Sequence, residues 1–249
     1  MPLTPLSSAA EVLVATSHDP FARGVLRHPK IRGWLADSAV AWLAVDNEQR
    51  VSYLSALGEP ADVGALLAEL GGELPPRQRL TLPRGTPAHL PAWLAIDGTD
   101  WDFRWLAAPP AGQDGEDAVT PVLDDEVAAL LAISSPTASA QPGDPKVRGW
   151  VGIRDTSRLV ACAADTSSAT GVGHLSSIAV HPSARGRGLG RAVTAALTRQ
   201  LFAEGCDLVT LGMYTSNAAG RAMYDALGFA DDHPFTSGPL TLQPDRTRG

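Results

Sequence analysis

The sequence predicts an α+β protein whose second half is a mixed, mostly antiparallel sheet with helices packed against it. Strand-like and helix-like segments alternate after residue 146 in the order β-β-β-α-β-α-β. Apolar residues make up 44% of the 249 residues, which is enough for a proper core. Two linker-like stretches, AAPPAGQDGED and SSPTASAQPGDP, separate this half from the first. We therefore expect an N-terminal domain over residues 1–110, a linker and helix over 111–145, and a C-terminal core over 146–249.

The first half has an α+β pattern and contains no chemical motif that we can identify. Its strand candidates are AVAWLAV (39–45), VSYLSAL (51–57), RLTL (79–82) and WDFRWLA (101–107). Its helix candidates are ADVGALLAEL (61–70) and PAHLPAWLAI (87–96). A four-residue echo, IRGW at 31–34 and VRGW at 147–150, raises the hypothesis that this half is a smaller, degenerate copy of the second.

The second half can be followed element by element. A helix, LDDEVAALLAIS (123–134), comes before it, because the acidic residues 124–126 suit a first helical turn. The next segments are strands VRGWVGIRD and RLVACAAD, joined by a turn at 155–157, and then strand GHLSSIAV. They are followed by helix RAVTAALTRQLFAEG, strand DLVTLGMYT and helix NAAGRAMYDALGF. Gly205 and Gly228 suit the ends of the two helices.

Composition excludes several classes of function. The formal net charge is −7, with a pI near 5.3, which argues against general nucleic-acid binding. Two cysteines are too few for a disulfide framework or a zinc cluster, so we expect no metal. The N-terminal segment lacks a basic leader region, and no stretch approaches the length needed to cross a bilayer. We expect a cytoplasmic protein with no membrane or nucleic-acid partner.

Residues 185–191 contain three arginines and three glycines between a predicted strand and a predicted helix. The free N–H groups of the first helical turn, the helix dipole and the guanidinium groups all favour an anion there. Such a loop is typical of a phosphate site. A Walker loop would need a Lys followed by Ser or Thr, and a dinucleotide fingerprint would need Gly rather than Arg191.

The second half contains two motifs, Arg185-x-x-Gly188-x-Gly190 and a segment that runs from Asn217 through Gly220 and Tyr224 to Gly228-Phe229. Together they resemble the GNAT superfamily of acyl-CoA-dependent acyltransferases. The first is similar to the family's loop for the pyrophosphate of coenzyme A, and the second resembles a family helix, with Gly220 in place of the usual Ala. Asn217 and Tyr224 are seven residues apart, so a helix places them on one face. The resemblance covers about residues 120 to 240 and does not cover the first half.

The resemblance implies direct transfer of an acetyl group from acetyl-CoA to a primary amine. Tyr224 matches the residue that donates a proton to the departing thiolate. His174 lies six residues before Val180, where relatives carry the general base. Ser176 and Ser177 alternate on the same strand, so one of them is expected to face the active site. The cofactor-binding residues that the resemblance implies are Ile178, Ala179, Val180, Arg185, Gly186, Arg187, Gly188, Leu189, Gly190, Arg191 and Asn217.

Alternatives to this function remain open at the level of sequence. A non-catalytic acyl-CoA sensor would use the same loop, although binding alone needs no proton donor at Tyr224. A third hypothesis keeps the enzyme and gives it a longer acyl-CoA as donor. The acceptor is expected to be a small-molecule or peptide amine of unspecified identity, and a homodimer is left open.

Overall fold

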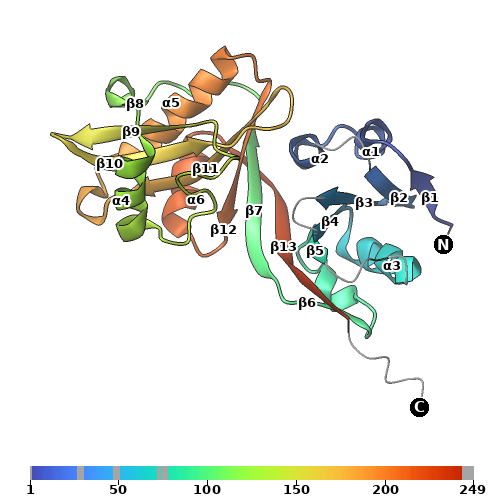
Figure 1. Cartoon of the computed structure of the whole chain (residues 1–249). Coiled ribbons are helices and arrows are strands. Elements are labelled where there is room, and N and C mark those ends of the chain that lie inside the picture. Colours follow the sequence, from blue (N-terminus) through green and yellow to red (C-terminus); the bar gives the residue numbers. More distant parts are fainter. Residues whose placement is uncertain (1, 27–30, 47–50, 72–73, 75–77, 243–249) are drawn as a thin grey trace. The chain divides into compact units, whose positions relative to one another are not determined.

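The computed structural model describes residues 2–26, 31–46, 51–71, 74 and 78–242. The chain divides into two compact units, which are described separately (Figure 1). Unit 1 comprises residues 1–103 and 232–249, and unit 2 comprises residues 104–231. Strands β7 (Thr99–Leu106) and β13 (Ala230–Leu242) carry the chain from one unit into the other.

Unit 1 is a sheet of strand order β1-β2-β3-β4-β5-β13, with β6 also paired to β13. Its other elements are β1 (Thr4–Leu6), α1 (Ala9–Ala15), α2 (Pro20–Val25), β2 (Ile31–Ala36), β3 (Ala39–Asp46), β4 (Val51–Leu57), α3 (Pro60–Leu70), β5 (Gln78–Pro83), η2 (Thr86–His89) and β6 (Leu94–Ile96). Strands β2, β3 and β4 are antiparallel neighbours, and β4 pairs with β5 in parallel. Helix α3 packs the buried Val63, Leu66 and Leu67 into the core of this unit.

The helix predicted at residues 87–96 is wrong. The structure has a short 3-10 turn at Thr86–His89 and the strand β6 instead. Pro91 lies between them and has no N–H to donate, and it disfavours helical backbone at the preceding residue. Leu90 is accordingly extended, with φ −72° and ψ 146°.

Unit 2 is a sheet of strand order β12-β11-β10-β9-β8. Its elements are η3 (Glu116–Ala118), β8 (Thr120–Pro121), α4 (Asp124–Ser134), β9 (Gly149–Asp155), β10 (Arg158–Asp165), β11 (Val172–Val180), η4 (Pro182–Ala184), α5 (Leu189–Ala203), β12 (Leu208–Tyr214) and α6 (Ala218–Ala226). The predicted order β-β-β-α-β-α-β is confirmed by β9 to β13. Gly205 and Gly228 follow the two helices with φ of +99° and +85°, the conformation that favours glycine at a helix end.

The division into units differs from the predicted boundaries at both ends of the C-terminal half. Residues expected to form a linker belong to unit 2, because β8 pairs with β9 and α4 packs on β10 and β11. The last strand belongs mostly to unit 1, because β13 pairs with β5 and with β6. Strand pairing and the packing of α4, which the sequence does not display, account for these assignments.

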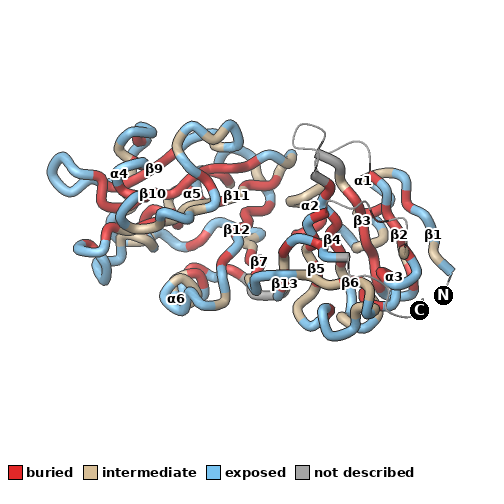
Figure 2. The backbone as a smooth tube through the Cα atoms, turned by 60° about the horizontal axis from the view of Figure 1, so that its bottom comes forward, coloured by how far each residue is buried: buried red, intermediate tan, exposed pale blue. Residues whose placement is uncertain are grey.

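The sheet of unit 2 separates two apolar layers. Ala161 and Ala163 point to the face covered by α5 and α6, and Cys162 and Ala164 point to the face covered by α4. Figure 2 shows buried residues concentrated along β10, β11 and α5.

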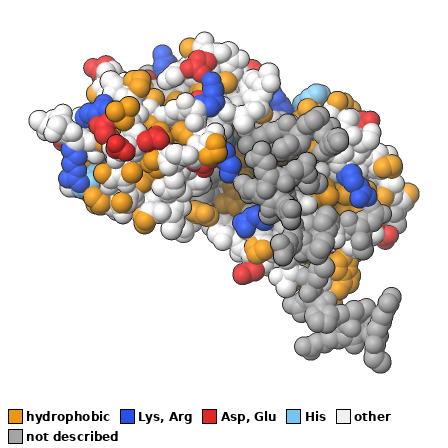
Figure 3. All heavy atoms as spheres, viewed as in Figure 1, with side chains coloured by type: hydrophobic (Ala, Val, Ile, Leu, Met, Phe, Trp, Pro, Cys, Tyr) orange, Lys and Arg blue, Asp and Glu red, His pale blue; other side chains and the backbone are white. Residues whose placement is uncertain are grey.

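Acidic and basic side chains are intermixed on the face of this unit seen in Figure 3. In the described part of the chain, no helix is long and apolar enough to cross a membrane.

Strands β11 and β12 separate after a short paired stretch. They are parallel over four register pairs, from Val172↔Leu208 to Leu175↔Leu211. Beyond this point β11 continues to Val180 and β12 to Tyr214 without further pairing between them. This is the pair of diverging strands that the GNAT resemblance implies. A β-bulge follows at once, because Ser176 lies opposite Ala164 and Ala179 lies opposite Cys162.

Candidate functional site

The loop before α5 exposes backbone amides. Gly186 and Gly188 have φ of +76° and +77°, and a Cβ added at either would meet no atom within 4 Å. Gly188 is the N-cap of α5, and its carbonyl accepts the first intrahelical bond from Ala192 N–H at 3.0 Å. The N–H groups of the first turn therefore have no acceptor inside the helix. The glycines give this loop an open surface lined by donors.

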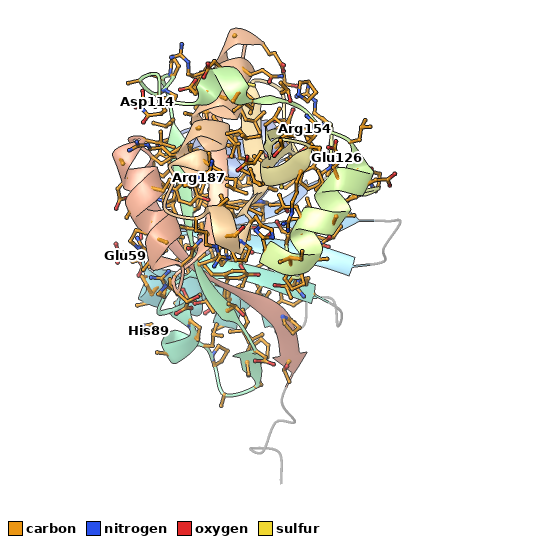
Figure 4. All side chains as sticks on the ribbon, turned by 90° about the vertical axis from the view of Figure 1, so that its left-hand side faces the viewer. Glu59, His89, Asp114, Glu126, Arg154 and Arg187 are labelled. Atoms are coloured by element: carbon orange, nitrogen blue, oxygen red, sulfur yellow. The ribbon has the colours of Figure 1, made fainter. Side chains whose placement is uncertain are left out.

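The three arginines of this loop differ in their surroundings. Arg187 Nη1 donates to Asp155 Oδ2 at 2.9 Å, which ties the loop to the turn between β9 and β10 (Figure 4). Arg185 and Arg191 are exposed and have no hydrogen-bond or ion-pair partner among the described residues. The positive charge at the mouth of α5 therefore comes chiefly from Arg185, Arg191 and the helix dipole.

Gly190 joins three parts of the predicted site. A Cβ at this position would lie 3.2 Å from Met223 Sδ of α6 and 3.3 Å from Val180 Cγ2 at the end of β11. Glycine thus allows the start of α5 to approach both elements closely. The loop, the end of β11 and helix α6 therefore lie close together here. Leu189, beside Gly190, packs partly buried against the same core.

The β-bulge in β11 lies where this strand stops pairing with β12. Ser177 has φ +51°, a strained conformation for a non-glycine residue. Its Oγ donates to Ala140 O at 2.8 Å and accepts from Ala140 N at 2.9 Å, so it secures the loop after α4. The main chain of Ile178, Ala179 and Val180 follows, where β12 is no longer paired to β11. The bulge interrupts simple alternation between Ser176 and Ser177. Ser176 Oγ lies 2.8 Å from Thr166 Oγ1, and the orientation of either serine toward an active site stays a prediction.

Asn217 is the N-cap of α6. Its Oδ1 accepts from Gly220 N–H at 2.9 Å, which satisfies a free donor of the first turn. A Cβ on residue 220 would lie 2.4 Å from Asn217 Nδ2, so glycine, rather than the family's alanine, gives this cap its room. Contact of Asn217 with a cofactor stays a prediction.

Tyr224 is buried in the core between the sheet and α5. Its ring packs edge-on against Phe229, with the centroids 5.8 Å apart. Burial raises the pKa of Tyr224 to about 12, while the positive charge of Arg104 acts in the opposite direction. The phenol is therefore protonated at neutral pH. No hydrogen bond of its hydroxyl to another described residue is found.

His174 lies on the opposite face of the sheet from Tyr224. It is in register with Thr210, whereas the next pair, Leu175 and Leu211, points into the core that contains Tyr224. Thr210 Oγ1 donates to Gly173 O at 3.0 Å and lies 2.8 Å from His174 Nδ1. We infer that the ring proton is on Nδ1, so that Nε2 is the basic nitrogen.

Arg104 is a site residue that sequence reasoning missed. Its side chain is 2% exposed, and it forms an ion pair with Asp225 of α6. The available signal was a charged residue within the aromatic strand WDFRWL, at a spacing that places it on a buried face. In the described chain, no group of three His, Cys, Asp or Glu residues could hold a metal ion.

Comparison with known proteins supports the fold and the family. Residues 113–229 match the family model described as "Acetyltransferase (GNAT) family". A mycothiol acetyltransferase from Beutenbergia cavernae is 30% identical over 190 residues, which cover 71% of this chain and 52% of the relative. The chain thus spans about half the length of this curated relative.

Two solved structures match nearly the whole chain. A GCN5-related N-acetyltransferase from Kribbella flavida has a TM-score of 0.55 and 21% identity, covering 95% of this chain and 96% of that one. Another from Sphaerobacter thermophilus has a TM-score of 0.56 and 14% identity, covering 97% and 96%. At these identities the likeness shows the fold, and it extends over both units. Residues 113–229 therefore form a domain of the GNAT acetyltransferase family.

Proposed function

We propose that the protein is an N-acetyltransferase that moves an acetyl group from acetyl-CoA to a primary amine. The observation that carries the proposal is the close approach at Gly190 of the arginine- and glycine-rich loop, the end of β11 and helix α6, which carries the buried Tyr224. In the same unit, β11 and β12 diverge beyond Leu175 and Leu211. The pyrophosphate would lie on the amides of residues 186–191 beside Arg185 and Arg191. The pantetheine arm would extend along the edge of β11 at Ile178–Val180.

The reaction needs two proton transfers. The neutral amine nitrogen attacks the thioester carbonyl carbon, the C–S bond breaks, and the sulfur leaves as a thiolate. The amine loses a proton and the thiolate gains one. His174 and Tyr224 lie on opposite faces of the sheet, which suits a base on the acceptor side and an acid on the thiol side.

Tyr224 is suited to concerted proton donation. A phenol with a pKa of about 12 is fully protonated at neutral pH. Stepwise transfer to a free thiolate of pKa near 8.5 would be uphill by about 5 kcal/mol. The proton must therefore move as the C–S bond breaks, when hydrogen bonding to the developing negative charge is strongest.

The proposal is tested by measuring free thiol released from acetyl-CoA with a panel of amines. Because a relative is named a mycothiol acetyltransferase, the amine acceptor of mycothiol acetylation is the first member of the panel. Parallel assays with longer acyl-CoA donors test the alternative that the enzyme transfers a longer acyl group. CoA binding without thiol release for any amine would favour the sensor function.

Tyr224→Phe tests the acid. The variant should lower kcat about 10²- to 10⁴-fold while KM for acetyl-CoA changes little, because the lost interaction forms in the transition state. Near-normal kcat at every pH would leave Tyr224 with a packing role only. His174→Ala should lose most activity at low pH, where the amine is mainly protonated, and the loss should shrink as pH rises. If the activity lost in His174→Ala does not vary with pH, the general base is another group.

A further inference from the structure

Arg104 makes several contacts with the segment that runs from Arg221, inside α6, to Phe229, just after the helix ends. Its Nη1 donates to Arg221 O at 3.3 Å, and its Nη2 donates to Phe229 O at 3.1 Å and to the carboxylate of Asp225. The side chain is 2% exposed, whereas that of Asp225 is 55% exposed. The buried side chain of Arg104 in β7 therefore contacts three residues of the segment 221–229.

These three points surround Tyr224 in the sequence. Arg221 comes three residues before it, Asp225 follows it directly, and Phe229 comes five residues after it. Helix α6 has nine residues, too few to be stable by its own hydrogen bonds. Asn217 caps its first turn, and the contacts of Arg104 secure its last turn, where Tyr224 lies. The cation also lies near the carboxyl end of the helix dipole, where positive charge is favourable.

We propose that Arg104 is a positioning residue for the transfer reaction and fixes the direction of the Tyr224 hydroxyl through its fork of contacts on α6. The proposal rests on the proposed role of Tyr224 as acid. Arg104 lies outside the matched family domain at residues 113–229, so the strand that enters unit 2 supplies part of the catalytic geometry. Arg104 Nε is buried and has no hydrogen-bond partner in the described chain, so the terminal nitrogens carry all of these hydrogen bonds.

Lysine cannot replace this arrangement. Its single ammonium retains the charge but lacks two terminal nitrogens at a fixed separation. Arg104→Lys therefore keeps the ion pair with Asp225 feasible while it loosens the hold on the Arg221 and Phe229 carbonyls. A shift of about 1 Å in the Tyr224 hydroxyl is enough to lower the rate substantially.

The test is a double-mutant cycle between Arg104→Lys and Tyr224→Phe in the full chain. Arg104→Lys alone should lower kcat about 10- to 100-fold, with KM for acetyl-CoA within about twofold of the wild-type value. In the Tyr224→Phe background the same substitution should change kcat less than about twofold, because the hydroxyl that it positions is already gone. Asp225→Asn, at a more exposed position, should show the same dependence on the tyrosine with a smaller loss.

Arg154→Lys is the matched control. Arg154 also forms a forked contact, with Nε 2.7 Å from Glu126 Oε1 and Nη2 2.6 Å from Oε2, but on the side of the sheet covered by α4 (Figure 4). It should leave kcat unchanged in both backgrounds. Equal losses from Arg104→Lys with and without the hydroxyl would overturn the positioning role and leave the tyrosine as acid. A normal kcat for Tyr224→Phe alone would instead overturn the acid and, with it, this inference.

Discussion

Helices α3 and α5 occupy the same place in the two units but begin with different chemistry. Each follows the third of three antiparallel strands and precedes a strand that pairs in parallel with that third strand. Helix α5 begins after a loop with three arginines and three glycines. Helix α3 begins at Pro60 and is preceded by Gly58 and the N-cap Glu59, so a carboxylate replaces the guanidinium groups and proline removes an amide donor. Only α5 has the composition of an anion site.

The parallel strand pairs on either side of these helices, β4 with β5 and β11 with β12, diverge in both units. In unit 1, pairing of β4 with β5 ends at Ser55↔Thr81, and a cavity of about 590 Å³ includes Leu57, Glu59 and Arg84 in its lining. Arg84 Nη2 lies 2.5 Å from Asp102 Oδ1, so its charge is already compensated. The shared topology thus supplies a gap in both units, and the residues at its mouth decide what each gap can hold. Acetyl-CoA is expected at unit 2.

Among the substitutions that test this comparison of the two units, Gly58→Ala should have the largest effect, because it should destabilise unit 1 without affecting CoA binding. Gly58 has φ +131°, and an added Cβ would lie 2.9 Å from both Ala39 Cα and Ser38 O. Backbone strain and overpacking together should cost about 2 to 4 kcal/mol. Thermal unfolding should start about 5 to 15 °C lower. A loss of CoA affinity in calorimetric titration would show that the start of α3 takes part in binding, contrary to the comparison.

Gly188→Ala should weaken CoA binding and should have little effect on the stability of the fold. A Cβ there meets nothing within 4 Å, so the folded loop has space, but φ of +77° is unfavourable for alanine by roughly 1 to 2 kcal/mol. In the free protein the exposed loop should relax to a conformation that suits alanine. Binding of CoA must then return the loop to its strained conformation, which should weaken CoA affinity about 5- to 30-fold. Gly205→Ala, at the other end of α5 with φ +99°, is the matched control and should leave affinity unchanged. Unaltered affinity in Gly188→Ala would place the pyrophosphate elsewhere.

The sequence predicted most of unit 2 because its signals are local. Gly205 and Gly228 mark helix ends, and the glycines between 186 and 190 mark a loop that needs positive φ. The echo IRGW and VRGW leads to the buried Trp34 in β2 and Trp150 in β9, each in the first of three antiparallel strands, which supports two related halves. These features depend on neighbours a few residues apart.

The features that the sequence did not reveal depend on distant partners. Arg104 is separated from Asp225 by 121 residues, and Ser177 from Ala140 by 37, so no periodicity links either pair. The bulge at Ser177 also breaks the alternation from which side-chain directions were predicted. In unit 1, Pro87 and Pro91 turned an apparently apolar helix into a turn and a strand. The hydrophobic pattern predicted a helix there, and the backbone restrictions of proline outweigh that pattern.

Asp155→Asn gives the smallest effect and the finest test of the anion loop. Arg187 and Asp155 form an ion pair in which both side chains are about half exposed, at 53% and 52%. A surface pair of this kind contributes at most about 1 kcal/mol to stability, so the fold should be unaffected. Removing the carboxylate charge should free Arg187 to turn toward the pyrophosphate and should also remove a repulsion near it.

The expected result is CoA affinity about two- to threefold tighter at low ionic strength, because one more exposed guanidinium becomes available to the phosphates. The gain should fade toward 1 M salt, where the Debye length is about 3 Å. Arg187→Ala should change wild-type affinity little but should cancel the gain in the Asp155→Asn background, whereas Arg185→Ala should weaken binding in both. If Arg187→Ala already weakens the wild type as much as Arg185→Ala, then Arg187 leaves Asp155 on binding, and all three arginines act on the anion. Calorimetric titration of the three single and two double variants at two salt concentrations distinguishes these outcomes, because the dependence of affinity on salt counts the charges that contact the ligand.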